Sequence, residues 1–152
     1  MGGMSCALVC ERDRRSGDWS LRSASSSGTG PSARRPARIL VVEDVFLESL
    51  QLESELRAAG YTVLGPCRSL AAAREAVRAG GFDLAVLDVN LAGEMVYPLA
   101  DELVRAGVPL VLLSGYLRGD LPERFRGQPR LHKPHAPDLL LRVIRKALPE
   151  RA

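Results

Sequence analysis

Short apolar runs alternate with longer segments along the chain from Arg38 onward. The runs are RILVV, YTVLG, FDLAVL, VPLVLL and the brief PRLH. Stretches such as ILVV and LVLL are apolar without alternation, as in strands that are buried on both faces. Strands that alternate with helices favour a parallel sheet with helices on both sides. The pattern therefore predicts an α/β fold built from five strand–helix units.

The segments between the runs predict helices of unequal quality. Residues 45–60 place apolar side chains near helical spacing and stop at a glycine, and residues 69–81 begin with a serine cap. Residues 95–107 and 136–148 also read as helices. Residues 116–128 are interrupted by glycine and proline, so we expect a short or frayed fourth helix and a loosely held segment 117–128. The apolar positions of the first helix are Phe46, Leu47, Leu50, Leu52 and Leu56, and those of the last are Leu139, Leu140, Val143, Ile144 and Leu148.

The start of the chain differs in composition from the rest. Residues 1–37 lack apolar periodicity and contain the run SASSSGTGPSARRP, so the sequence predicts a disordered leader. A single domain at 38–148 and a tail at 149–152 would follow. Residues 1–38 hold seven Arg and three Asp/Glu, whereas residues 39–152 hold fourteen Lys/Arg and fifteen Asp/Glu. The domain is therefore almost neutral, which argues against direct DNA binding.

Cysteine content and hydropathy point to the cytoplasm. The three cysteines, Cys6, Cys10 and Cys67, are odd in number and follow no secretory signal, which argues against a disulfide framework. No apolar run approaches the roughly 20 residues that cross a bilayer. We therefore expect no membrane partner.

Polar side chains stand where the predicted strands end. Glu43 and Asp44 follow the first strand, Asp88 the third, Ser114 the fourth and Lys133 the fifth. Because ligands of an open parallel sheet bind at the carboxyl ends of its strands, these residues are expected to share one site.

Three clustered carboxylates repel one another unless a cation joins them. Mg²⁺ suits such a set, with Asp44 and Asp88 bound directly and Glu43 reaching it through water or from further away. The backbone carbonyl of Asn90 would add a further ligand.

Asp88 could then attack a phosphoryl donor and form an acyl phosphate. The Lys133 ammonium would offset the new charge, and the Ser114 hydroxyl would donate a hydrogen bond to a phosphoryl oxygen. The prediction is a phosphoacceptor at Asp88.

These motifs resemble the receiver domain of two-component response regulators. The resemblance covers residues 38–148 and rests on VVED, VLDVNL, LLSG and the KP before the last helix. It implies a flavodoxin-like sheet with strand order 2-1-3-4-5, Mg²⁺ as cofactor, and phosphotransfer to Asp88 from a histidine kinase or phosphotransfer protein. It also implies a conformational change centred on Ser114 and Lys133, and a cis peptide before Pro134.

The chain departs from the family at its switch residue. Arg130 stands where receivers commonly carry a rotating aromatic. SGY after the fourth strand, with LDVNLAGEMVYPLADELVRAGVP, resembles single-domain alphaproteobacterial receivers with a Phe-Ala-Thr-Gly-type motif, whose kinases are often of the HWE type. Leu112 and Leu113 replace Phe-Ala. Tyr116 is a candidate substitute for the missing aromatic switch.

Two other functions fit parts of the pattern. Haloacid-dehalogenase-like phosphatases also place an Asp nucleophile at a strand end, but they need a second Asp where this chain has Asn90. A pseudo-receiver would bind partners without phosphorylation. We expect a non-enzymatic receiver with at most slow self-phosphorylation and self-dephosphorylation. With no output domain recognisable, it would act on an unknown downstream protein or as a phosphate sink.

Overall fold

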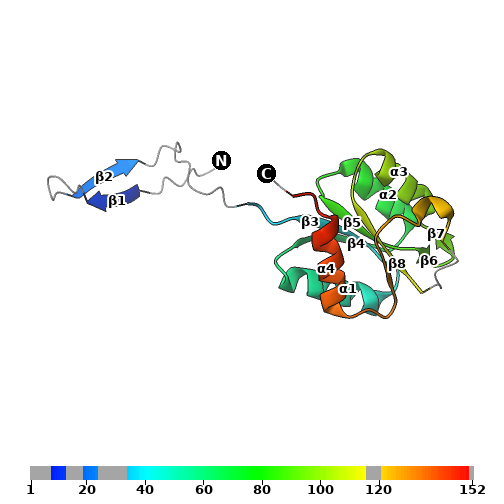
Figure 1. Cartoon of the computed structure of the whole chain (residues 1–152). Coiled ribbons are helices and arrows are strands. Elements are labelled where there is room, and N and C mark those ends of the chain that lie inside the picture. Colours follow the sequence, from blue (N-terminus) through cyan, green and yellow to red (C-terminus); the bar gives the residue numbers. More distant parts are fainter. Residues whose placement is uncertain (1–7, 13–18, 24–33, 116–120, 151–152) are drawn as a thin grey trace. The chain divides into compact units, whose positions relative to one another are not determined.

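The computed structural model describes residues 8–12, 19–23, 34–115 and 121–150, and the chain divides into two units, Met1–Arg34 and Arg35–Ala152. In the first unit, strand β1 (Leu8–Arg12) pairs antiparallel with β2 (Trp19–Ser23), as Figure 1 shows. The composition of the leader did not predict this hairpin. The other residues expected to be disordered lie outside the described ranges, apart from 34–37.

The second unit contains the predicted five-stranded parallel sheet. Its spatial order is β4-β3-β5-β8-β9, which is the flavodoxin-like order 2-1-3-4-5. The fold predicted from the sequence is confirmed. The strand bounds are β3 Arg38–Val42, β4 Thr62–Cys67, β5 Leu84–Asp88, β8 Leu110–Ser114 and β9 Arg130–His132.

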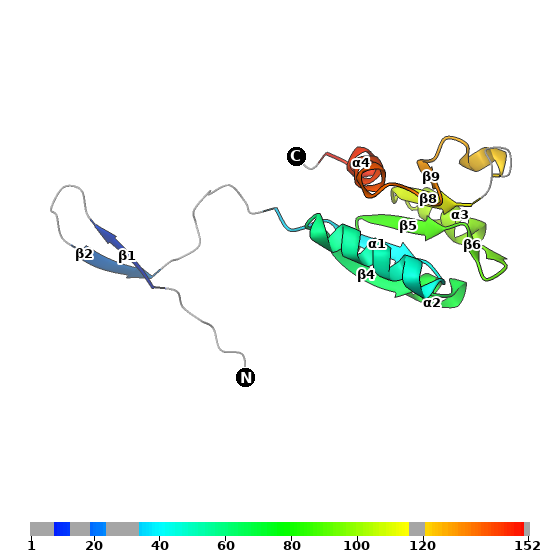
Figure 2. The same cartoon turned by 90° about the horizontal axis from the view of Figure 1, so that it is seen from below.

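Helices cover both faces of this sheet. Helices α1 (Phe46–Ala58) and α4 (Pro137–Ala147) lie on one face, and α2 (Leu70–Ala79) and α3 (Tyr97–Arg105) lie on the other (Figure 2). Residues of β3 alternate between the two cores, since Ile39 packs toward α1 and Leu40 toward α2 and α3. Burial on both sides explains why the central strands are apolar without alternation.

Helix α1 buries fewer of its apolar side chains than their spacing suggested. Leu52 and Leu56 are buried, with Ser49 completing the inner face. Phe46, Leu47 and Leu50 are exposed. The sheet-facing stripe is narrow because a helix on one face of a sheet presents only part of its surface to the core.

The fourth helix is short, as expected. Among the described residues between β8 and β9, the helical structure is a single 3-10 turn, η1 (Glu123–Phe125). The expectation of a loosely held segment is wrong for its described part. Leu121 and Phe125 are buried, and the Phe125 ring stacks on Tyr97 of α3 with ring centroids 5.4 Å apart. The stacked rings of Phe125 and Tyr97 hold this segment against α3, although its glycines and proline had indicated a loose structure.

Three local features shape the edge of the sheet where the strands end. After β5 the chain forms a small hairpin, β6 (Asn90–Leu91) with β7 (Glu94–Met95). The Lys133–Pro134 peptide is cis, as the resemblance implied. The pairing of β3 with β4 shifts register between Leu40 and Val42, opposite Gly65. Within the described ranges, no helix is long and apolar enough to cross a membrane.

Gly65 offers a test of how tightly the β3–β4 irregularity is packed. Its φ is +91°, and an added Cβ would lie 2.7 Å from the Val41 carbonyl oxygen. Gly60 has a similar φ of +89° with no atom within 4 Å of that position. We expect Gly65→Ala to lower the free energy of unfolding by about 3 kcal/mol. Gly60→Ala should cost about 1 kcal/mol, because it adds only backbone strain.

Urea denaturation of both variants beside the wild type measures this difference. Equal losses in the two variants would show that Gly65 is not constrained by its neighbours.

Candidate functional site

Adjacent strands bring the predicted residues to one edge of the sheet. Glu43 follows β3, Asp88 ends β5, and Ser114 ends β8. These three polar residues are buried, with exposed fractions of 0%, 6% and 2%. Lys133 follows β9, and its backbone N–H donates to the Ser114 carbonyl at 3.0 Å. The ends of the parallel strands therefore form one compact polar site.

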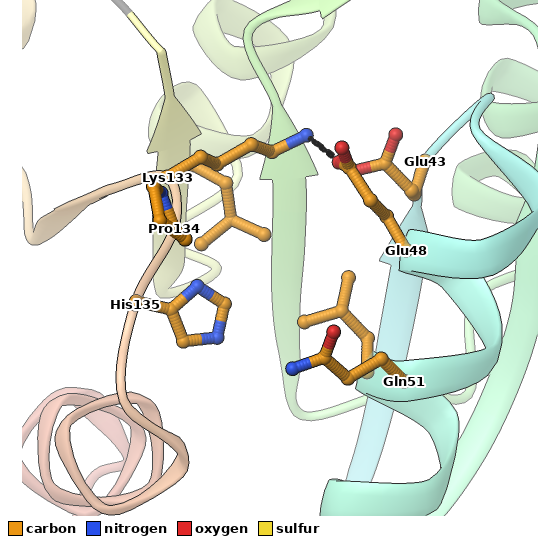
Figure 3. Close-up of a pocket in the computed structure, with 8 residues that line it drawn as sticks. Glu43, Glu48, Gln51, Lys133, Pro134 and His135 are labelled. Carbon is orange, nitrogen blue, oxygen red and sulfur yellow. Dashed lines mark hydrogen bonds and ion pairs between the residues drawn. The ribbon is translucent and has the colours of Figure 1, made fainter.

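The Lys133 ammonium lies among three carboxylates. Its Nζ donates to Glu43 Oε2 at 2.6 Å, to Asp88 Oδ2 at 3.0 Å, and to Glu48 Oε2. Figure 3 shows the Lys133 side chain extending from the β9–α4 loop toward Glu43 and Glu48. An ammonium has three N–H donors, so each finds one carboxylate acceptor.

Burial and charge act against each other at this cluster. Desolvation raises the pKa of Glu43 to about 7, although the hydrogen bond from Lys133 acts to lower it. Desolvation would lower the pKa of Lys133, but its hydrogen bonds to Glu43, Glu48 and Asp88 outweigh burial and raise it. The ammonium is therefore held in its charged form.

The second oxygen of Asp88 is held by the chain that follows it. Asp88 Oδ1 accepts from the backbone N–H of Asn90 at 3.2 Å, and Asn90 Oδ1 accepts from the N–H of Gly93 at 2.7 Å. These bonds fix the turn between β5 and β6. The predicted metal-binding role of the Asn90 carbonyl stays a prediction.

Asp44 lies beside the cluster but outside the group of acids closest to one another. That group is Glu43, Glu48 and Asp88, which offer ligand oxygens within 4.8 Å of one another and could hold a metal ion. Asp44 Oδ1 is buried without a hydrogen-bond partner. A buried carboxylate oxygen needs a proton donor or a cation, so Asp44 is suited to bind a hard divalent ion. That it does so together with Asp88 stays a prediction.

Sequence reasoning missed Glu48, and Tyr116 lies outside the described residues. Glu48 occupies the first turn of α1, four residues beyond Asp44. An acid in that position is ordinarily explained by the positive end of the helix dipole. Glu48 lies on a different side of the helix from the exposed Leu47. This position could have indicated that its side chain faces the strand ends.

A cavity of about 370 Å³ opens beside the cluster between α1 and the β9–α4 loop (Figure 3). At its wall, His135 Nε2 lies 3.7 Å from Glu55 Oε2, and both side chains are about nine-tenths buried. The lining residues are Glu43, Glu48, Gln51, Leu52, Leu113, Lys133, Pro134 and His135. The Lys133 side chain, which is 20% exposed, forms part of the wall of this cavity.

Several solved structures are similar to this chain in fold and sequence. SdrG from Sphingomonas melonis Fr1 has 35% identity, covers 73% of this chain and 95% of its own, and gives a TM-score of 0.66. The BeF3-activated conformation of SdrG, from Pseudomonas melonis Fr1, gives 0.62 at 33% identity over 71% of this chain and 92% of that one. The receiver domain of the response regulator PhyR from Erythrobacter litoralis gives 0.65 at 26% identity, over 74% and 89% of the two chains.

A curated relative supports the same family over a shorter stretch. The transcriptional regulatory protein PdtaR of Mycobacterium tuberculosis is 31% identical over 103 residues, which are 64% of this chain and 50% of that protein. The chain thus spans about half the length of this relative. No family model matches the chain. From the fold, the strand-end site and the likeness to SdrG, the chain belongs to the response regulator receiver family of two-component signalling proteins.

The raised pKa of Glu43 predicts how stability depends on pH in the metal-free protein. In the folded state Glu43 keeps its proton up to about pH 7, whereas its unfolded value is 4.5. The free energy of unfolding should therefore fall as pH rises from 4.5 to about 7. Glu43→Gln should remove this part of the pH dependence, because the amide does not titrate.

Urea midpoints across this range, with a chelator present, measure the difference between the wild type and Glu43→Gln. Parallel pH profiles for the two proteins would contradict the assignment.

Proposed function

We propose that the chain accepts a phosphoryl group on Asp88 from a histidine kinase, with the HWE type as one candidate, or from a histidine phosphotransfer protein, in a Mg²⁺-dependent reaction. The observation that carries this proposal is the hydrogen bond of 3.0 Å from Lys133 Nζ to Asp88 Oδ2 in a buried site. The bond puts a positive charge directly beside the Asp88 carboxylate, in a site where both groups are largely shielded from water.

The chemistry transfers one phosphoryl group. A carboxylate oxygen of Asp88 forms a bond to phosphorus as the bond from phosphorus to the donor's imidazole nitrogen breaks. The freed imidazole keeps the electron pair and can take up a proton. Lys133 offsets the charge that reaches Asp88, and the Ser114 hydroxyl donates a hydrogen bond to a phosphoryl oxygen.

Mg²⁺ bound by Asp44, Asp88 and the Asn90 carbonyl, with Glu43 close by, would neutralise the phosphoryl oxygens. The buried, unpartnered Asp44 Oδ1 supports this assignment. Without a cation, the acids at this edge would repel an incoming phosphoryl group.

The relatives support phosphoacceptor chemistry over a pseudo-receiver. One structure of SdrG is of its BeF3-activated conformation. BeF3 resembles a phosphoryl group on a carboxylate. In this chain Glu43, Asp88, Ser114 and Lys133 stand at strand ends or directly after them. Output would pass to a downstream protein, or the domain would serve as a phosphate sink.

Incubation with acetyl phosphate and Mg²⁺ should add one phosphoryl mass to the intact wild-type protein. We expect no gain for Asp88→Asn, because the amide is a poor nucleophile, and almost none when a chelator removes Mg²⁺. Asp138→Asn is a matched control, since Asp138 is exposed in the first turn of α4 and is not one of the three acids paired with Lys133. It should gain mass like the wild type. A full mass gain in Asp88→Asn would exclude Asp88 as the acceptor.

A further inference from the structure

At least one of the three carboxylates around Lys133 has to give up its hydrogen bond when Asp88 is phosphorylated. In the structure its three N–H donors are already occupied by Glu43, Glu48 and Asp88. A phosphoryl group on Asp88 carries about two negative charges and strong acceptor oxygens. For Lys133 to bind these oxygens, one existing partner has to leave.

The three partners differ in how easily they can leave. Glu43 is fully buried, and its Oε1 also accepts from the backbone N–H of Val45 at 3.1 Å. Asp88 is the phosphoacceptor itself. The Glu48 side chain is 44% exposed, so its carboxylate can return to water. Moving Glu43 would leave a fully buried carboxyl group without its Lys133 partner, which is far more costly than releasing a half-exposed one.

Glu48 also adds charge where the phosphoryl group must approach. Its carboxylate lies within 4.8 Å of carboxylate oxygens of Glu43 and Asp88, and it lines the cavity that opens onto Lys133. Two effects therefore act in the same direction, since Glu48 competes for the ammonium and repels the incoming anion.

We propose that Glu48 is a positioning residue that holds the Lys133 ammonium in the unphosphorylated protein and must release it when Asp88 is phosphorylated. Glu48 thereby opposes phosphorylation and favours the unphosphorylated state. This inference rests on the proposed function of Asp88. The first turn of α1 would therefore respond directly to phosphorylation, because its Glu48 side chain contacts the Lys133 ammonium.

The position of the ammonium also separates two groups of oxygens at the site. Lys133 contacts Glu43, Glu48 and Asp88 Oδ2, whereas Asp88 Oδ1 faces the backbone N–H of Asn90 and Asp44 Oδ1 has no hydrogen-bond partner. We therefore assign Glu48 to Lys133 and not to the metal, although Glu48 also belongs to the acid group that could hold an ion. This distinction makes the effect of Glu48 separable from that of Mg²⁺ concentration.

The variant Glu48→Gln tests the proposal, with Glu53→Gln as its control. Glu53 lies on the same helix and pairs with Arg57 at 2.7 Å, so its change removes an equal charge outside the site. At saturating Mg²⁺, we expect Glu48→Gln to accept phosphate from acetyl phosphate about three- to tenfold faster than the wild type. Beryllofluoride should bind more tightly by a similar factor, and the Mg²⁺ concentration for half-maximal rate should not change.

A second measurement reads the contact without any phosphoryl group. The chain has two lysines, Lys133 and Lys146, so lysine labelled with ¹³C at Cε gives two side-chain NMR signals. Glu48→Gln should shift the Lys133 signal and leave that of the exposed Lys146 in place. Glu53→Gln should move neither signal. Saturating beryllofluoride with Mg²⁺ should bring the Lys133 signals of wild type and Glu48→Gln together.

Two results would overturn the inference. Unchanged rates and an unmoved Lys133 signal in Glu48→Gln would show that Glu48 does not hold the ammonium. Slower phosphorylation with a higher Mg²⁺ requirement would make Glu48 a metal ligand instead. Failure of the proposed function looks different, because the wild type itself would then take neither phosphate nor beryllofluoride.

Discussion

The site depends on one ammonium group held among carboxylates at the end of a parallel sheet. Lys133 Nζ contacts Glu43 from β3, Asp88 from β5 and Glu48 from α1, and these residues lie up to 90 positions from Lys133 along the chain. Without the ammonium, the buried Glu43 and Asp88 would repel each other across the sheet edge. The positive charge of Lys133 stabilises these buried acids, and the same charge would bind a phosphoryl group on Asp88.

The sheet was predictable from the sequence, since strands that are buried on both faces consist of continuous apolar residues. Runs such as LAVL and LVLL gave the strands, and their polar ends gave Glu43, Asp88, Ser114 and Lys133. The structure brings these residues to one edge, because neighbouring parallel strands end together. Local glycine and proline signals also located the weak fourth helix.

Other features depend on long-range contacts that a linear pattern does not record. The place of Glu48 in the site depends on the packing of α1 beside the strand ends, which brings its carboxylate to Lys133. The anchoring of η1 depends on the stack of Phe125 on Tyr97, and on two hydrogen bonds from Arg124 to Asp101 at 2.9 and 3.1 Å. Residues that are 23 to 28 positions apart make these contacts. The role of Tyr116 in relaying the signal stays a prediction.

The most direct measurement locates the phosphoryl group on the chain. Borohydride reduces an acyl phosphate to an alcohol, so the acceptor aspartate becomes homoserine and can be found by peptide mass spectrometry. After treatment with acetyl phosphate and Mg²⁺, the account predicts homoserine at position 88 and at no other aspartate. Homoserine at position 44, or at a surface aspartate with position 88 unmodified, would contradict it.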